Sequence, residues 1–595
     1  MFLATTALSE FWKKDSDIMF LGEWCFLYDQ QKELENINYK TMDYPWDDPV
    51  AFYKAKEYCD RIYEYLLTNL TVYLNAIHNV KYSQRYWRII IGPWLMHYIQ
   101  PLYDKYVCLK NAFEQYPNLE TLCLSERSYI TPIDLQSFKF LSANDPYNLQ
   151  LYSELIKLMG YTMPEQDYAV NRVTTQVVHG QGQSKFAYPK NMIKDALRKL
   201  SPFSNRIGGR LSSKLMGQMS IRTLDSLKIC LKSGLRVWPI FPIELNISQL
   251  SINHKLRRGL LDICKKDISD PFLKIIIQTL PYNFPIAYME GYSTIRKYVS
   301  KCFVHSTRAI IDACGWFINE PFKVLAAEKA ETGSLLVYAQ HGGLEGIGRI
   351  CPGEPHEIAL SDYFFSWGWK KQGCHKVKPM PYARISLLQK KETSQKYYGN
   401  GPILHISSVF PRYLQFFQTV PVGPQVLKYL GEQFSFIKNL PPRIRQMLII
   451  RPYPFHEYGW QQYQRFRDLF PNNTIDYYNR PIHEKFKMCR LVICSDLQTT
   501  FLEAMAYNIP TLLIISSELW EIRDDAMPYF RELERVGILL YKEEDAIIKV
   551  EEIFDDPAIW WFSNEVQSIR KRFMNNFAFG CDNWLKIWVD ELVSL

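Results

Sequence analysis

The sequence lacks a long apolar run. Its most apolar tract, IIIGPWLMHYI, is too short to cross a bilayer and contains Pro93 and His97. The N-terminal stretch MFLATTALSEFWKKDSD has no basic segment ahead of an apolar one, so a secretory signal is not expected. We therefore expect a cytoplasmic protein that is either soluble or held peripherally at the cytoplasmic face of the inner membrane.

Cysteine pairs of the metal-binding type are also missing. The thirteen cysteines stand singly between Cys25 and Cys581, with no Cys-x-x-Cys among them and an odd total. This pattern favours reduced thiols in a cytosol and argues against a zinc site. No disulfides are expected.

A strong charge of one sign is absent as well. The net charge of +8 comes from 70 basic and 62 acidic residues scattered along the chain, which excludes a nucleic-acid footprint. The mild excess suits an anionic substrate or an acidic membrane surface. Residues 165–220 are polar, basic and rich in Gly and Ser, and predict an exposed loop. Such tracts are usually solvated surface; the functional alternative is contact with an anionic membrane or a lipid-linked pyrophosphate.

The length predicts more than one core. A chain of 595 residues exceeds what a single hydrophobic core supports, and its 47% hydrophobic content excludes general disorder. Short strands and periodic helices divide it into an N-terminal α/β domain over 1–385 with a helical insertion at about 47–230, a polar linker over 386–400, an α/β unit over 401–555, and helices over 556–595 that pack back on the first domain.

Strand and helix alternate strictly in the second unit. Apolar strands at PILHISSVF, QMLIIRPYP, TIDYY, LVICSD and TLLII are separated by helical segments. This order predicts a parallel, doubly wound, Rossmann-like sheet. Such sheets bind ligands at the carboxyl ends of their strands, so the loops that follow each strand are the places to look for function.

The segment between Ser334 and Trp369 combines glycines with several ionisable side chains. An apolar strand ends in a His-Gly-Gly turn, where Gly342 and Gly343 allow a close approach to a ligand. His341, Glu345 and Glu357 follow the strand closely. A purely structural loop explains the glycines but gives no reason to gather these ionisable side chains. We interpret the loop as half of an active site.

The helix that begins near Thr499 and Thr500 predicts the other half. Asp496 ends the preceding strand, and free amides at a helix start bind anions such as a nucleotide phosphate. Glu503 has two explanations, since it stands three residues after Thr500 and fits a simple capping box equally well. The Asn-x-Pro-Thr that follows is typical of nucleotide-sugar domains.

Three further residues in strand-end loops are candidates for donor binding. Arg451 follows the strand QMLII, and its planar guanidinium suits a phosphate or a carboxylate. Its alternative is an ordinary salt bridge. Ser408 and Arg412 lie in the loop after PILHI and offer a hydroxyl and a second guanidinium.

These features together resemble the GT-B glycosyltransferases. In detail the chain is similar to a family of transferases encoded in O-antigen and other surface-polysaccharide loci. The similarity rests on LATTAL, LGEWC, AQHGGLEG, RPYPFHEYGW, TTFLEAMAYNIPT and WEIRDDAMPYF, which span nearly the whole chain. Locally, the Gln-His-Gly turn is also similar to capsule enzymes that use CMP-linked keto-sugars and to polymerases that use CDP-glycerol.

The resemblance implies a GT-B-like fold of two Rossmann-like domains with a C-terminal crossing helix. It also implies transfer of a sugar from a nucleotide-activated donor, with a CMP-linked keto-sugar as one candidate, to an O-antigen or lipopolysaccharide acceptor that is lipid-linked or an oligosaccharide. We expect no cofactor and no metal, because no Asp-x-Asp stands where a cation would bridge a diphosphate. The general base would be His341, Glu345 or Glu357, with His341 favoured for its neutral-range pKa. If configuration is retained, Glu345 is instead a candidate nucleophile.

Two alternatives stay open at this point. The first is a CDP-polyol-type phosphotransferase on the same fold. The second is a non-catalytic polysaccharide-assembly protein, since fold alone does not establish activity. The donor, the acceptor, the stereochemical outcome and the oligomeric state are not predicted.

Overall fold

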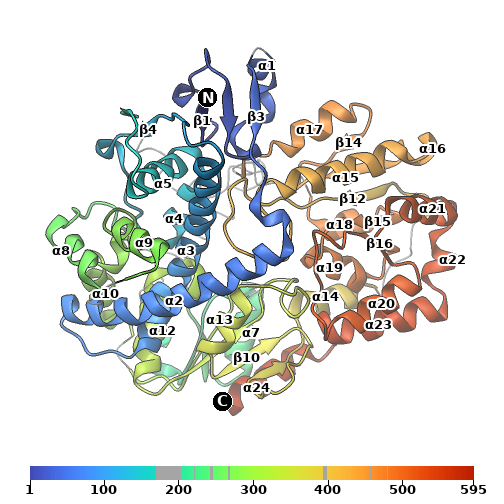
Figure 1. Cartoon of the computed structure of the whole chain (residues 1–595). Coiled ribbons are helices and arrows are strands. Elements are labelled where there is room, and N and C mark those ends of the chain that lie inside the picture. Colours follow the sequence, from blue (N-terminus) through green and yellow to red (C-terminus); the bar gives the residue numbers. More distant parts are fainter. Residues whose placement is uncertain are drawn as a thin grey trace.

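A computed structural model describes the chain over residues 1–35, 37–168, 203–208, 210–219, 221–241, 245–264, 268–303, 305–392, 399–453, 458–478 and 480–595. Of the segment 165–220 predicted as an exposed loop, residues 169–202 lie outside the described residues, as does 393–398 of the predicted linker; the prediction is wrong for Lys214–Met216, which form a buried strand of the first large sheet. The fold is α/β and GT-B-like, with two six-stranded parallel sheets and a large helical region between the N-terminus and the first of them (Figure 1).

The first three strands form a small sheet of their own. Strands β1 (Phe2–Ala4), β2 (Ile18–Phe20) and β3 (Tyr39–Thr41) pair in parallel in the order β1-β2-β3. Each strand is followed directly by the next, so they pair with one another, and long helices separate them from the larger sheet.

Two long helices make up the core of the helical region. Helix α2 (Pro49–His78) is capped by Asp48, and α3 (Gln84–Gln115) is capped by Ser83. They pack along each other, and α3 is buried along most of its length even though it contains Pro93 and Pro101. Among the described residues, no helix is both long and apolar enough to span a membrane.

Shorter helices complete this region. They are α4 (Leu135–Ser142), α5 (Asp145–Leu158), α9 (Pro271–Asn283), α10 (Tyr292–Cys302), α11 (Gly315–Ile318) and α12 (Glu320–Glu331). Helix α12 packs on α3 and leads directly into the first large sheet. The helical region therefore supports the strand end that carries His341.

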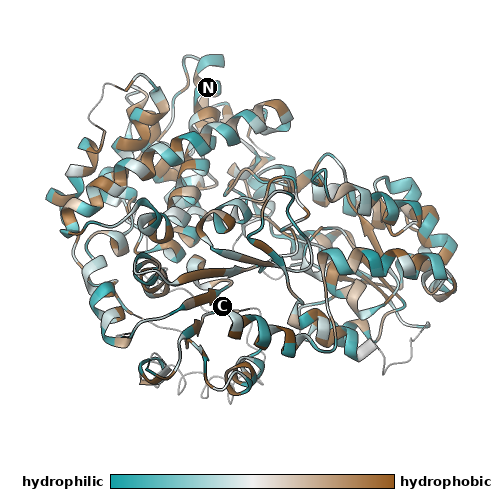
Figure 2. Ribbon diagram, turned by 90° about the horizontal axis from the view of Figure 1, so that it is seen from below, coloured by the Kyte–Doolittle hydropathy of each residue, from teal (hydrophilic) through white to brown (hydrophobic). Residues whose placement is uncertain are grey.

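The first large sheet is parallel throughout, in the order β11-β10-β9-β8-β6-β7. Its strands are β6 (Lys214–Met216), β7 (Val237–Pro239), β8 (Ala309–Asp312), β9 (Leu335–Ala339), β10 (Tyr363–Ser366) and β11 (Val377–Pro379). Seen from below, the brown strands lie among helices with teal outer faces (Figure 2). Helix α13 (Gly353–Leu360) links β9 to β10.

The second large sheet has the order β14-β13-β12-β15-β16-β17 and is also parallel. Its strands are β12 (Ile403–Ile406), β13 (Leu448–Arg451), β14 (Thr474–Ile475), β15 (Leu491–Cys494), β16 (Thr511–Ile514) and β17 (Leu539–Leu540). The chain reverses its direction of travel across the sheet between β12 and β15. A doubly wound sheet binds its ligand at such a reversal.

Helices cover both faces of this second sheet. They are α15 (Gln425–Asn439), α17 (Gln462–Leu469), α18 (Ile482–Phe486), α19 (Thr499–Tyr507), α20 (Met527–Arg535) and α21 (Glu543–Ile553). The alternation predicted from the sequence is confirmed.

The C-terminal helices bridge the two sheets. Helix α23 (Asn564–Phe577) packs on α19 and α20 of the second unit, and α24 (Trp584–Ser594) returns to the first. There Trp588 donates Nε1–H to the carbonyl oxygen of Pro381 at 2.8 Å. Helix α14 (Ala383–Glu392) occupies the start of the stretch predicted as a linker, because its apolar side packs against α19.

Other contacts join the two units away from the sheets. Gln100 on α3 accepts the backbone N–H of Phe417 at 2.7 Å, and Gln425 on α15 donates to the carbonyl oxygen of Trp46 at 3.1 Å. Both contacts satisfy backbone groups of one unit with a side chain of the other.

Candidate active site

The turn after β9 requires glycine at a point of close approach between the two units. A Cβ atom on Gly343 would lie 2.7 Å from the backbone nitrogen of Thr499, which starts α19. The amide of Gly343 donates to Thr499 Oγ1 at 3.2 Å. The predicted halves of the site, one after β9 and one at the start of α19, are therefore in direct contact.

Gln340 fixes the shape of this turn, a role that the sequence did not reveal. Its amide donates to the carbonyl oxygens of Gly342 and Glu345 at 2.8 and 3.1 Å. Its Oε1 accepts from the backbone of Trp367 and the indole of Trp369 at 2.7 and 2.8 Å. The Trp-Gly-Trp element thus holds the loop through one buried glutamine. The only signal was its place directly before the His-Gly-Gly turn.

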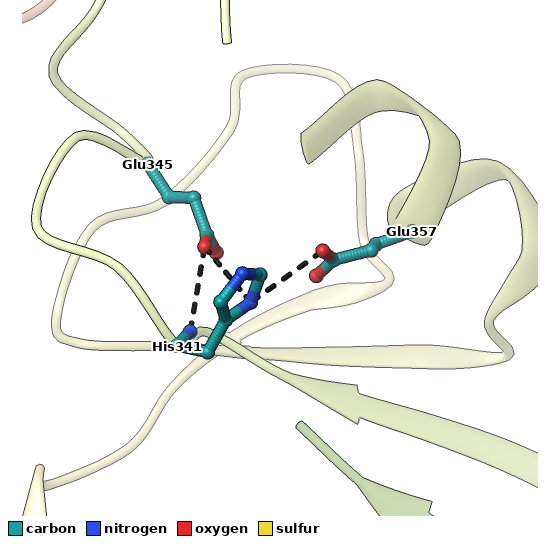
Figure 3. A group of neighbouring side chains, drawn as sticks. All are labelled: His341, Glu345 and Glu357. Carbon is teal, nitrogen blue, oxygen red and sulfur yellow. Dashed lines mark hydrogen bonds and ion pairs between the residues drawn. The ribbon is translucent and has the colours of Figure 1, made fainter. Parts of the chain in front are cut away.

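His341, Glu345 and Glu357 come together as a cluster (Figure 3). His341 Nδ1 lies 3.1 Å from Glu345 Oε1 and 3.6 Å from Glu357 Oε1. Glu345 Oε1 also faces the backbone amides of His341 and Gly342, at 3.4 and 3.1 Å. Glu357, on α13, is fully buried, and both its carboxyl oxygens lack a hydrogen bond among the described residues.

The cluster's electrostatics favour a neutral histidine. Burial lowers the pKa of His341 to about 4, and the positive charge of Lys139 adds to this. Burial raises the pKa of Glu345 and of Glu357 well above the ordinary range, with Glu354 adding to both. Backbone amides oppose the rise at Glu345 and not at Glu357. We therefore expect Glu357 to be the carboxyl that keeps its proton near neutral pH.

This arrangement points the other ring nitrogen of His341 outward. Nδ1 is buried against the two carboxyls, whereas the side chain as a whole is 32% exposed. No described residue hydrogen-bonds to Nε2. Nδ1 lies 3.1 Å from Glu345 Oε1, and in the tautomer that carries its proton on Nδ1 the ring leaves Nε2 with the free lone pair that a general base needs. The carboxyl that the sequence offered as a nucleophile, Glu345, is instead placed to orient the histidine.

The same cluster has the composition of a metal site. Atoms of His341, Glu345 and Glu357 that can serve as ligands lie within 4.8 Å of one another. One nitrogen and carboxylate oxygens would suit a divalent cation. Metal independence stays a prediction.

The start of α19 forms the second half of the site. Its N-cap residue, Gln498, makes no side-chain capping hydrogen bond. No residue in the described part of the chain hydrogen-bonds to the amides of Thr499 and Thr500, so these amides can receive an anion, with the hydroxyl of Thr500 beside them. Asp496 is buried at the end of β15 and accepts the amide of Gln498 at 2.8 Å. Burial raises the pKa of Asp496 to about 7.

Glu503 does not cap α19. Its carboxylate pairs with Arg384 on α14, at 2.5 Å from Nε and 3.0 Å from Nη2. Glu503 is buried while the Arg384 side chain is 53% exposed, so the pair reaches the protein surface rather than lying inside a core. Arg384 was not predicted, because its partner is distant in the sequence.

Arg451 and Arg412 have structural partners, which corrects their predicted role at the phosphate. Arg451 pairs with buried Asp476, and its guanidinium lies 3.7 Å from the ring centre of Tyr478. Arg412 pairs with Asp145 and donates to the carbonyl oxygen of Trp24 at 2.6 Å. Both charges are buried and neutralised. Their sequence positions were right for a strand end, but their side chains turn into the protein.

Ser408 lies beside a cavity at the end of the second sheet. Its amide donates to the hydroxyl of Tyr429 at 2.8 Å, which also bonds Ser495. The cavity has a volume of about 80 Å³. Its lining comprises His405, Tyr429, Glu432, Gln433, Phe436, Ser495, Ile514, Ile515, Trp520, Tyr541 and Glu543. His405 Nδ1 and Trp520 Nε1 are buried without a partner among the described residues, so the cavity wall offers unused polar groups.

The segment WEIRDDAMPYF closes the loop after β9 from the side of the second unit. Gly348 and Ile522 form an antiparallel bridge, and Arg523 pairs with Glu354 at 3.1 Å. Glu354 in turn accepts the amide of Gly346, whose φ of +79° favours glycine. This segment had no clear meaning in the sequence. It holds the loop that follows β9 against the second unit.

Comparison with known proteins agrees with a transferase. The profile of a family described as LIC12162 family transferase matches residues 1–592. No curated protein matches the sequence at a significant level.

Solved structures are similar only at a distance. A HepE structure from Anabaena in complex with UDP and glucose has a TM-score of 0.35 and 11% identity, covering 64% of this chain and 100% of its own. The wall teichoic acid polymerase TagF gives 0.31 and 8%, with 68% and 96% covered. Trehalose-6-phosphate synthase gives 0.33 and 9%, with 64% and 99% covered. These scores are too low to support an argument about substrate.

Proposed function

Because the chain belongs to the LIC12162 family of transferases, we propose that it transfers a sugar from a nucleotide-activated donor to a hydroxyl of a surface-polysaccharide acceptor. The observation that carries this proposal is the contact between Gly343 and Thr499. It brings a candidate base beside a free helix start. A transferase needs a proton acceptor and an anion site next to each other.

In this proposal the donor's phosphate binds at the start of α19. The free amides there and the hydroxyls of Thr499 and Thr500 supply hydrogen bonds that stabilise the leaving nucleotide as its charge develops. The nucleoside would extend over the end of the second sheet, where Glu503 and the cavity beside Ser408 offer polar groups. Asp496 lies between these places at the end of β15.

The acceptor's proton goes to His341. As the acceptor oxygen attacks the anomeric carbon, the bond from that carbon to the phosphate oxygen breaks, and the hydroxyl proton moves to His341 Nε2. The carboxylate of Glu345, 3.1 Å from Nδ1, would stabilise the imidazolium that forms, as the acid does in a hydrolase triad. A CDP-polyol phosphotransferase would use the same base with a phosphorus atom as the electrophile, so product analysis separates the two.

A nucleotide screen tests the donor site directly. We expect one of CMP, CDP, UMP, UDP, GDP and dTDP to raise thermal stability selectively, since a ligand present at a hundred times its Kd stabilises by about 2.7 kcal/mol. Incubation of the protein with the matching activated sugar should then release that nucleotide. Stabilisation without any release, with any acceptor, would favour the assembly-protein alternative. If the folded protein binds none of the six, the proposed donor site is wrong.

We further propose that the protein contacts an anionic membrane through helix α7 (Thr223–Lys232). Leu224, Leu227 and Leu231 are 70, 40 and 71% exposed, at the spacing of one helix face. Exposed Lys228 and Lys232 flank them. An apolar stripe bordered by cations is typical of helices that lie in a membrane interface.

Vesicle sedimentation checks this contact. The wild-type protein should bind vesicles containing anionic lipid and not neutral ones. Changing the three leucines to serine should reduce the partition coefficient more than about tenfold, since each removes apolar burial. The matched control replaces Val72, Ile548 and Ile559 with serine. These three native side chains are 69, 63 and 78% exposed. Equal loss in both triple variants would contradict a role for α7.

A further inference from the structure

Lys139 is a half-buried cation without an acidic partner. It lies on α4, and no carboxylate in the described part of the chain pairs with it. Its Nζ is 3.9 Å from the ring centre of Phe317 on α11. Burial lowers the pKa of Lys139 to about 8, and no neighbouring acid opposes this. Cations in such surroundings are normally paired or hydrogen-bonded.

A second polar side chain beside the same ring also lacks a partner. His97 on α3 is 2% exposed, and neither of its ring nitrogens has a hydrogen bond among the described residues. Its ring centre is 5.1 Å from that of Phe317 and 4.0 Å from that of Phe416. Buried polar groups are rarely left unpaired without a reason. Lys139 and His97 therefore both lie beside the ring of Phe317 without a hydrogen-bonding partner among the described residues, and an anion would supply one.

This place adjoins the candidate base. The ring of Phe317 is 5.1 Å from Trp316, whose ring is 6.5 Å from His341. The charge of Lys139 contributes to the lowered pKa of both His97 and His341. The other titratable groups around His341 are acidic: Glu345, Glu357, which is expected to be protonated, and Glu354, which pairs with Arg523. An anionic substrate group would be repelled there unless a cation offset those acids.

We propose that Lys139, beside His97, binds an anionic substituent, a carboxylate or a phosphate, carried by the saccharide that reacts at His341. This rests on the proposed function and narrows its substrate class to acidic saccharides or saccharide phosphates. The anion is separate from the donor's phosphate, which is placed at α19 in the second unit. Lys139 positions the saccharide through its charge, and the ring centre of Phe317 lies 3.9 Å from its Nζ.

The first test measures the reactivity of Lys139 itself. The protein is treated with an amine acylating reagent in the presence of glucose, glucuronate or glucose 6-phosphate at equal concentration, and the modified lysines are quantified by mass spectrometry. One of the two anions should slow acylation of Lys139 several-fold while glucose does not. Glucuronate would identify a carboxylate site and glucose 6-phosphate a phosphate site. Lys110, which is exposed and near Glu114, is the internal control. Equal rates at Lys139 in all three sugars would overturn the proposal.

The second test uses variants and separates this proposal from the donor site. Lys139→Met keeps the stem and removes the charge, so KM for the saccharide substrate should rise about 10- to 100-fold, the range of a lost charged hydrogen bond. Lys139→Arg should restore most of it, and nucleotide binding should be unchanged in both. A Met variant with KM within twofold of wild type would show a purely structural lysine. If the wild-type protein binds no nucleotide, the proposed donor site is wrong. The acylation of Lys139 still tests the anion site independently of that result.

Discussion

His341→Ala should lower turnover by about a thousandfold or more while leaving nucleotide affinity unchanged, because removal of a general base costs about 10²–10⁴ in rate. We propose that the donor's nucleotide binds the second unit, so its binding should not depend on the imidazole. The measurement is kcat with saturating donor, paired with calorimetric titration of the nucleotide. His375→Ala is the matched control, since His375 is exposed on the same unit. Near-wild-type turnover of His341→Ala would remove this residue from the mechanism.

The pH profile gives an independent reading of the same residue. A base works when it is unprotonated, and the pKa of His341 is lowered to about 4. The rate should therefore hold as pH falls from 7 to about 5 and decline through about 4, whereas an ordinary histidine would lose activity near 6.5. Because Lys139 contributes to the lowering, Lys139→Met should move the decline to higher pH. A wild-type decline centred near 6.5 would show that His341 is not desolvated as the structure indicates.

Thr500→Ala combined with Glu503→Gln should weaken nucleotide binding about 10- to 100-fold, with a smaller effect on kcat. The double variant removes a hydroxyl at the start of α19 and the carboxylate charge that pairs with Arg384. The expected loss corresponds to one or two hydrogen bonds involving charged groups. Calorimetric titration of the nucleotide selected in the screen measures it.

The control for this variant is Glu518→Gln, a charge removed at a site that is 73% exposed. It should bind nucleotide as the wild type does. If the double variant keeps wild-type affinity, Glu503 and Thr500 serve the packing between α14 and α19 and not the donor. If kcat falls while affinity holds, the two side chains act on the reaction and not on binding.

The sequence predicted the second unit better than the first for a physical reason. In the second unit each strand is a continuous apolar run bounded by helices of clear period, so order and direction follow from local pattern. In the first, β8 is the short run Ala309–Asp312 between helical segments, and β6 follows a long polar stretch. The strands of the second unit are not longer, but those of the first are separated by stretches of uneven length, so their pairing depends on contacts distant in sequence.

The candidate site was likewise only partly predictable from the sequence. The cluster of His341, Glu345 and Glu357 was predictable because its members follow one strand within one loop, so proximity in sequence gives proximity in space. The roles of Arg451 and Arg384 were not, because each depends on which acid the folded chain brings beside it. Asp476 neutralises Arg451, while Glu503 leaves Arg384 partly exposed. A guanidinium's partner is a tertiary property that a strand-end position does not reveal.

Two hydrogen bonds between the units, Gln100 with Phe417 and Arg412 with Trp24, affect whether one unit can be exchanged for that of a related chain. Here each lobe completes the hydrogen bonding of the other's backbone, so a crossover near residue 400 would leave polar groups orphaned on both sides. Specificity in this protein is expected to diversify by substitution within the cleft rather than by shuffling whole lobes.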